Sequence, residues 1–219
     1  MPSSTQPRTA SAIRHRLVCY DCFKPQVACV CASIEPVANR TGIIILQHPR
    51  ERFHAVGTAR IARLGLVKVR VESRAPRARD SAMSVPFPAR TALLYPTNGA
   101  QELAAMPVVE RPQNLVVLDG TWFHAKKIYD AYQWLRDLPH VSLTPSEPSR
   151  YRIRREPKPH YVATLEAIVC ALRIIEPHTR GLDGLLRSFA AMIDRQAAYT
   201  PTTKKSLVPS TLNFTSGGG

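Results

Sequence analysis

The chain has 219 residues, of which 44% are hydrophobic, and its 30 Lys and Arg against 16 Asp and Glu give a formal net charge of +14 at pH 7. This length is enough to bury the core of one α/β domain. The sequence lacks the run of roughly 18 apolar residues that a membrane-spanning helix requires. Four of the cysteines lie close together and no secretion signal precedes them, which argues against a disulfide framework and predicts a metal site in a cytoplasmic protein.

The excess positive charge is concentrated in two parts of the chain. Residues 50–90 hold ten Arg or Lys against three acids, and residues 150–160 hold five against one. Dense basic blocks are typical of proteins that bind a polyanion, most simply the phosphates of a nucleic acid. The alternative is a basic, solvated surface without a partner.

A cysteine cluster is the first element along the chain. Residues 1–15 have the composition of a flexible start, and residues 16–36 then hold four cysteines in the pattern C-x2-C-x6-C-x-C. These are Cys19, Cys22, Cys29 and Cys31. Four thiolates are the ligands of a tetrahedral structural zinc site, and they leave no coordination position open for catalysis. The pattern therefore predicts structural zinc.

The next segment predicts a buried strand and an edge strand. Residues 43–46 are consecutive aliphatics, and Pro49 ends the strand, so that His48 and Arg50 lie at its carboxyl end. Residues 58–66 predict a short helix, and residues 67–71 alternate Val with basic residues, as an edge strand does.

Two further strands are predicted on either side of the middle of the chain. Residues 91–96 form a strand that proline ends, residues 99–106 a short helix, and residues 107–114 a connection. Residues 115–118 are four aliphatics, typical of a strand that is buried on both faces. Thr121 can then cap a helix. The inner face of that helix would carry Trp122, Ala125, Tyr129 and Tyr132.

The remaining elements complete an alternating pattern. Residues 138–143 predict a strand, and residues 144–161 a long loop rich in Pro and Arg, of the kind that is usually functional. Thr164 is expected to cap a helix with Glu166 near its positive end, and a last helix begins near Leu182. Within residues 37–199 this alternation predicts a mainly parallel α/β sheet with helices on both faces, while residues 200–219 have the composition of a disordered tail.

Asp119 is the candidate functional carboxylate. It follows a central strand and precedes Gly120, which is where open α/β sheets place their ligand chemistry. The alternative is that Asp119 serves only to cap the following helix. Neither G-x-G-x-x-G nor G-x-x-x-x-G-K-[ST] is present, so the sequence does not support a dinucleotide or P-loop site.

The stretch Asp119-Gly120-Thr121-Trp122 resembles the D-x-T-W signature of the DTW-domain family, the tRNA-uridine aminocarboxypropyltransferases. The resemblance spans roughly residues 16–195. It includes the four cysteines, Gln47-His48-Pro49-Arg50-Glu51, Leu93-Leu94-Tyr95-Pro96, the arginine-rich residues 149–154, and Thr164-Leu165-Glu166-Ala167. It implies a SPOUT-like fold with a knotted carboxyl-terminal region, and it strengthens the assignment of zinc to the cysteines.

The resemblance also implies a reaction. The 3-amino-3-carboxypropyl group of S-adenosylmethionine would move to N3 of a tRNA uridine, with release of 5′-methylthioadenosine. Asp119 would be either the general base that removes the N3 proton or the anchor of the cofactor's ammonium group. Two alternatives remain open at this point, a SPOUT-like RNA methyltransferase and a non-catalytic zinc-containing module that binds RNA.

The implied site residues fall into three sets. The catalytic set is Asp119, Thr121 and Trp122, although Trp122 could instead be core and Glu166 only a helix-start charge. The cofactor set is Leu94, Tyr95, Pro96, Asp119, Gly120, Ser149, Tyr151, Arg152, Arg154, Thr164 and Glu166. The set expected to contact tRNA is His48, Arg50, Arg52, Lys126, Lys127, Arg150 and Arg155.

Overall fold

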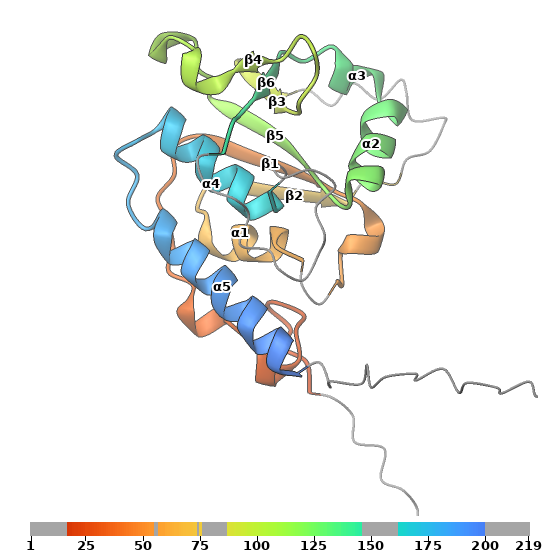
Figure 1. Ribbon diagram of the computed structural model, residues 1–219, viewed down its shortest axis with the longest axis vertical. Coiled ribbons are helices and arrows are strands. Elements are labelled where there is room, and N and C mark those ends of the chain that lie inside the picture. The colour runs from red at the N-terminus through yellow and green to blue at the C-terminus, as the bar shows by residue number, and fades with distance from the viewer. Residues whose placement is uncertain (1–16, 55–56, 74, 76–86, 146–161, 200–219) are drawn as a thin grey trace, which may run out of the picture.

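Six strands lie side by side in one sheet in the computed structural model, in the order β2-β1-β5-β3-β6-β4 (Figure 1). The structure describes residues 17–54, 57–73, 75, 87–145 and 162–199. The strands are β1 (Gly42–Gln47), β2 (Val69–Ser73), β3 (Thr91–Leu94), β4 (Gln101–Glu102), β5 (Asn114–Asp119) and β6 (His140–Ser142). Every pairing between neighbours in the sheet is parallel, which confirms the predicted α/β class.

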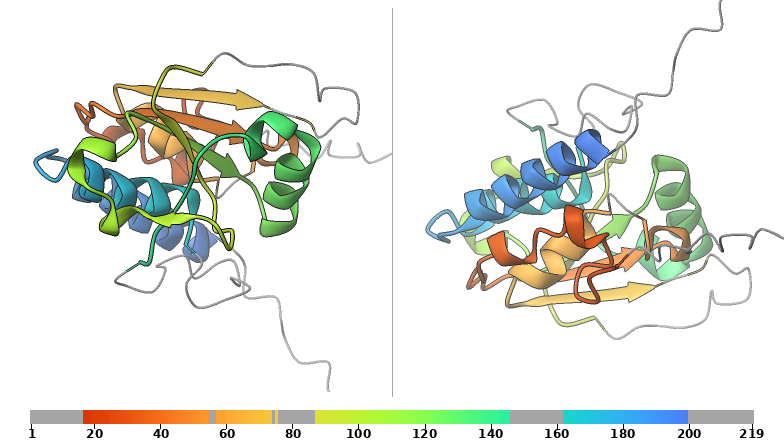
Figure 2. Two further views of the ribbon diagram at one scale, coloured as in Figure 1. Left: turned by 90° about the horizontal axis from the view of Figure 1, so that it is seen from above. Right: turned by 90° about the horizontal axis from the view of Figure 1, so that it is seen from below.

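The neighbouring strands β1 and β5 are aliphatic on both faces, and each face is covered by helices. On one face the core includes Ile43, Ile45, Leu115 and Val117, packed with residues of α1 (Ala59–Gly65), α4 (Thr164–Ile175) and α5 (Leu182–Tyr199). On the other face it includes Ile44, Leu46, Val116 and Leu118, packed with residues of α2 (Trp122–Ala131) and α3 (Gln133–Arg136). Figures 1 and 2 show the sheet between these two helical layers.

Close packing joins the helices of the first layer. A Cβ atom added to Gly65 of α1 would lie 2.2 Å from the Leu185 side chain of α5, so this crossing requires the small residue.

None of the helices in the described part of the chain is both long enough and apolar enough to span a membrane.

The structure corrects one expectation about local elements and adds one element. Residues 99–106 were expected to be helical, but Gln101–Glu102 pair with β6 as strand β4, and a 3-10 turn (Leu103–Ala105) follows with Leu103 fully buried. Pairing with the sheet and burial of one leucine override a segment of good helix formers. The short helix α3 was not anticipated.

All six strands point the same way, so their carboxyl ends share one edge of the sheet. The ends of β1 and β5 lie beside the start of α2, at the right of Figure 1. The start of α4 faces the same edge. This edge therefore brings together segments that are far apart in the sequence.

Candidate active site

Asp119 lies at this carboxyl edge, where it links β5, β1 and α4. It is buried, and its two oxygens accept hydrogen bonds from different elements: Oδ2 from the Gln47 amide at 2.8 Å, and Oδ1 from the Thr164 hydroxyl at 2.7 Å. The backbone N–H of His48 donates to the Asp119 carbonyl at 2.9 Å. The carboxylate is thus held in one orientation by two strands and a helix.

The cap of α2 is supplied by Thr121, as predicted. The Thr121 hydroxyl accepts a hydrogen bond from the His124 backbone N–H at 3.2 Å. The Asp119 side chain accepts hydrogen bonds from Gln47 of β1 and Thr164 of α4. Thr121 thus caps α2, while Asp119 also links the strand β1 to α4.

Thr164 differs from its predicted role. The N-cap residue of α4 is Ala163, whose N–H donates to Glu166 Oε2 at 2.8 Å, and Thr164 is the first helical residue. Because Thr164 is the first helical residue and not the N-cap, its hydroxyl is not used to cap α4 and binds Asp119 instead. Glu166 is buried, and this contact is the helix-start role that the sequence left as an alternative for it.

Sequence reasoning missed Gln47 as a site residue. Gln47 ends an otherwise aliphatic strand and is buried, and it stands opposite Asp119 in the register of β1 with β5. A polar residue at the end of a buried strand was the signal available, but the register that places it against Asp119 is not readable from one sequence.

Two histidines stack beside the Asp119 carbonyl. The rings of His48 and His124 have centroids 3.9 Å apart and are inclined by 2°. Glu51 is buried next to them, with Oε1 3.5 Å from Nδ1 of His124. A Cβ atom added to Gly120 would lie 2.8 Å from Cβ of His124 and 3.5 Å from Cβ of His48, so the pair requires glycine at this position.

Burial, together with the neighbouring His124 and Arg50, lowers the pKa of His48 below its ordinary value of 6.5. The ring is therefore neutral near pH 7. Nδ1 of His48 accepts a hydrogen bond from the Arg50 backbone N–H at 3.3 Å, so the proton of the neutral ring resides on Nε2. His48 can thus donate a hydrogen bond from Nε2, but it has no unoccupied nitrogen with which to act as a base.

The predicted cofactor residues of β3 lie on the same edge as Asp119. Leu94 pairs with Val117, two residues before Asp119. The Tyr95 ring stacks on Tyr129 of α2 with centroids 4.4 Å apart, and Pro96 is exposed. Ser149, Tyr151, Arg152 and Arg154, and the predicted RNA contacts Arg150 and Arg155, lie outside the described residues.

Most of the other predicted RNA contacts are exposed near the start of α2. Arg50, Arg52, Lys126 and Lys127 are exposed, whereas His48 is largely covered. Lys126 is also paired with Asp130 at 2.6 Å on the surface of α2. Trp122 is partly buried at the first position of α2.

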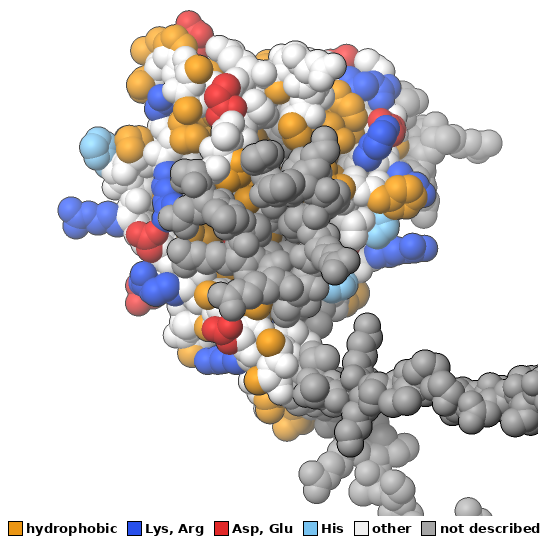
Figure 3. Space-filling view, viewed as in Figure 1, with side chains coloured by type: hydrophobic (Ala, Val, Ile, Leu, Met, Phe, Trp, Pro, Cys, Tyr) orange, Lys and Arg blue, Asp and Glu red, His pale blue; other side chains and the backbone are white. Residues whose placement is uncertain are grey.

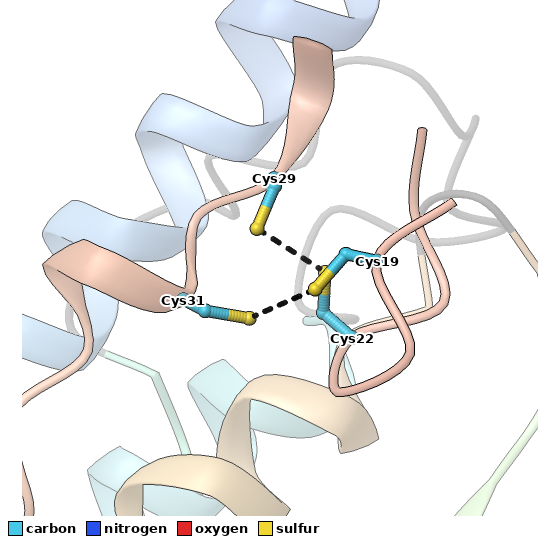
Figure 4. A group of neighbouring side chains, drawn as sticks. All are labelled: Cys19, Cys22, Cys29 and Cys31. Atoms are coloured by element: carbon cyan, nitrogen blue, oxygen red, sulfur yellow. Dashed lines mark hydrogen bonds between the residues drawn. The ribbon is translucent and has the colours of Figure 1, made fainter. Parts of the chain in front are cut away.

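The four cysteines of the amino-terminal segment come together as predicted. Their Sγ atoms all lie within 4.8 Å of one another, with Cys19 to Cys31 and Cys22 to Cys29 each at 3.8 Å (Figure 4). Tetrahedral zinc with Zn–S distances of about 2.3 Å separates its sulfurs by about 3.8 Å. The donor set and its spacing therefore fit such an ion.

The charge around this cluster also fits a tetrathiolate site. A hydrogen bond from the Cys22 backbone lowers the pKa of Cys19 to about 7, whereas burial raises the pKa values of Cys22 and Cys31. Lys24, whose side chain is almost fully buried, lies within the electrostatic reach of Cys22 and Cys31. Its cation would offset part of the negative charge that four thiolates around Zn²⁺ retain.

The cysteine segment is docked on α5. The Ser188 hydroxyl donates to the Ser33 carbonyl at 2.7 Å, and Arg195 donates to the carbonyl of Cys29. The segment also contacts the loop after β1, since the rings of Phe23 and Phe53 lie 5.3 Å apart. The cysteine segment thus contacts the same loop that carries His48 and Glu51.

These features define an α/β protein with a polar site at the carboxyl edge of a parallel sheet and a four-cysteine segment beside it. A DTW domain model matches residues 16–197, and the chain belongs to the DTW-domain family. No solved structure matches the chain at a significant level.

Three relatives illustrate the similarity. The chain is 31% identical over 197 residues to "tRNA-uridine aminocarboxypropyltransferase 2" of Macaca fascicularis, which covers 85% of this chain and 65% of that protein. It is 33% identical over 176 residues to the protein of the same name from Drosophila melanogaster (77% and 70%). It is 26% identical over 226 residues to "tRNA-uridine aminocarboxypropyltransferase A" of Arabidopsis thaliana (88% and 86%). The chain thus spans slightly less than two thirds of the length of the macaque relative.

Proposed function

We propose that this protein transfers the 3-amino-3-carboxypropyl group of S-adenosylmethionine to N3 of a tRNA uridine and releases 5′-methylthioadenosine. The names of the relatives support the reaction and its tRNA substrate. The observation that carries the proposal is the Asp119 carboxylate of the D-x-T-W stretch, fixed by Gln47 and Thr164 at the ligand-binding edge of the sheet.

The sulfonium is already a good leaving group, so the protein mainly has to select the carbon that is attacked. Orientation makes this choice: the methylene of the amino acid chain, and not the methyl group, must be in line with N3. A bond forms between N3 and that methylene as the carbon–sulfur bond breaks, and the electron pair leaves on sulfur. The N3 proton must be removed before or during attack.

The hydrogen bonds of Asp119 favour the anchoring role over that of the base. Gln47 and Thr164 each hold one oxygen of the carboxylate, so Asp119 is presented in a fixed orientation, which suits the binding of an ammonium group. Asp119→Asn separates the two roles. Loss of S-adenosylmethionine binding by calorimetry supports the anchor, whereas unchanged binding with lost transfer supports the base.

The other parts of the proposal follow from the arrangement of the edge. We place the adenosine among the strand-end loops that include Leu94, Tyr95, Pro96 and Gly120, as in a SPOUT-like fold with a knotted carboxyl-terminal region. Trp122 would stack on a ring of either substrate. Arg152 or Arg154 would receive the carboxylate of the transferred group.

The cysteine cluster would hold structural zinc through Cys19, Cys22, Cys29 and Cys31. A closed set of four thiolates supplies no open position for substrate, so the ion would order the segment that packs on α5 and the loop after β1. The exposed Arg50, Arg52, Lys126 and Lys127 would contact tRNA phosphates.

Mass spectrometry of tRNA nucleosides tests the reaction. Incubation with the protein and S-adenosylmethionine should give aminocarboxypropyl-uridine and an equal amount of methylthioadenosine. A methylated nucleoside with S-adenosylhomocysteine would identify a methyltransferase instead. Binding of tRNA with neither product would indicate a non-catalytic RNA-binding module.

A further inference from the structure

Two exposed phenylalanines flank the site at the carboxyl edge. Phe53 is 66% exposed and Phe123 is 63% exposed. Each carries a cation over its ring: the guanidinium carbon of Arg52 lies 5.2 Å from the Phe53 centroid, and Nζ of Lys127 lies 4.3 Å from that of Phe123. We call Phe53, Phe123 and these two cations the aromatic rim.

The aromatic rim is continuous with the histidine pair. The Phe123 ring lies 5.9 Å from His124, and His124 stacks on His48. His48 leads through the turn Pro49–Glu51 directly to Arg52 and Phe53. The rim therefore follows the sheet edge on both sides of the junction that fixes Asp119. Figure 3 shows basic, histidine and hydrophobic side chains gathered beside the start of α2.

The rim continues onto the cysteine segment. The Phe23 ring lies 5.3 Å from Phe53, and the guanidinium carbon of Arg60 lies 4.1 Å from the Phe23 centroid. Rings alternate with cations along this surface. That alternation distinguishes it from an apolar patch on which a hydrophobic partner would dock.

Flat rings with neighbouring cations match one kind of ligand. An unpaired nucleotide offers a flat base to the ring and a phosphate to the cation, whereas a base-paired duplex offers only phosphates at its surface. A wholly apolar partner would bury the ammonium and guanidinium groups without a counter-charge. The chemistry of the rim is therefore complementary to single-stranded RNA.

We propose that Phe53 and Phe123 stack on the unpaired nucleotides that flank the target uridine, and that Arg52 and Lys127 bind the phosphates between them. This inference rests on the proposed function. N3 of uridine is blocked by base pairing, so the target must leave its helix. Its neighbours then lose stacking partners, and the two rings replace them.

Stacking predicts a specific effect on RNA binding. Stacking of one base on an aromatic side chain contributes about 1–3 kcal/mol, so loss of one ring should weaken binding roughly 5- to 150-fold. The probe is a fluorescently labelled oligouridylate, with an RNA hairpin of the same length as the duplex comparison, and binding is measured by anisotropy without S-adenosylmethionine. Phe53→Ala and Phe123→Ala should each weaken binding of the oligouridylate by at least fivefold and of the hairpin by less than twofold.

Two further variants control for loss of an exposed apolar side chain and for loss of the ring. Val109→Ala removes a side chain of a residue that is 79% exposed, in the turn Val108–Glu110, and should leave binding unchanged. Phe53→Trp retains a stacking surface and should bind at least as tightly as the parent. Circular dichroism confirms that each variant is folded.

The inference is overturned if the two alanine variants bind oligouridylate like the parent, or if they weaken hairpin binding equally. In the transfer assay the same variants should raise KM for tRNA with little change in kcat. If the alanine variants carry out transfer with the KM for tRNA of the parent, the rim proposal fails while the proposed reaction stands. If no transfer occurs but the ring-dependent binding is present, the proposed reaction fails alone.

Discussion

Thr164→Val removes one of the two hydrogen bonds that orient Asp119. Valine has nearly the same shape as threonine, so the change leaves packing intact and deprives Oδ1 of a donor at 2.7 Å. Asp119 is buried, and a hydrogen bond to a charged group contributes about 1.5–3 kcal/mol. We expect the free energy of unfolding to fall by about that amount. We also expect the transfer rate to fall about 10- to 100-fold, because the carboxylate loses its fixed orientation.

A matched variant separates stability from function. The Thr179 hydroxyl donates to Glu176 Oε2 at 2.7 Å, and Glu176 lies after the end of α4, at the opposite edge of the sheet. Thr179→Val should therefore lower stability to a comparable extent and leave transfer unchanged. Urea unfolding and single-turnover transfer measure the two quantities.

A double-mutant cycle with Asp119→Asn tests the physical reason. If the Thr164 hydroxyl acts through the charged carboxylate, its removal should cost about 1 kcal/mol less in the Asp119→Asn background. An equal cost in both backgrounds would refute the reasoning, because the effect would then come from α4 itself.

Three other predictions follow from the site. Gly120→Ala should lower the free energy of unfolding by about 1–3 kcal/mol, since its Cβ would lie 2.8 Å from Cβ of His124; Gly99→Ala, where a Cβ meets nothing within 4 Å, should cost much less, and equal losses would contradict the packing argument. Elemental analysis of the parent should give about one zinc ion per chain, which Cys22→Ser should lose and Cys170→Ser should retain; equal zinc contents in the two variants would contradict the four-cysteine site. Because the pKa of His48 is lowered in the folded state, the unfolded chain binds the proton more readily, and stability should fall as the pH drops below about 6.5; urea unfolding of His48→Gln should show a shallower pH dependence, and an unchanged slope would contradict this assignment.

The parallel sheet and the polar residues at its carboxyl edge could be predicted from the sequence. They follow from patterns of neighbouring residues, namely aliphatic runs and helix-capping residues. The aliphatic runs of β1 and β5 are buried on both faces, as expected, and the helices that cover them begin near the predicted residues. Thr121 caps α2 for the local reason that its hydroxyl reaches an N–H three residues on. The prediction of a helix over residues 99–106 was wrong, because the pairing of Gln101–Glu102 with β6 is a tertiary contact that helix propensity does not include.

The contacts among the side chains of the site could not be predicted, because they depend on the register of the strands and on the exact residue at which α4 begins. Gln47 meets Asp119 only through the pairing of β1 with β5. Thr164 binds Asp119 because α4 begins one residue earlier than expected, with Ala163 and not Thr164 as its N-cap residue. The stacking of His48 on His124 requires both the register and the absence of a side chain at Gly120.

Transfer by Asp119→Asn, compared with Asp130→Asn, tests the central claim most directly. Both changes remove one carboxylate charge, but Asp119 is buried at the carboxyl edge, whereas the Asp130 side chain is 53% exposed and paired with Lys126. Nucleoside mass spectrometry should show aminocarboxypropyl-uridine with the parent and with Asp130→Asn, and almost none with Asp119→Asn. Equal product from both variants would contradict a role for the buried carboxylate in the reaction.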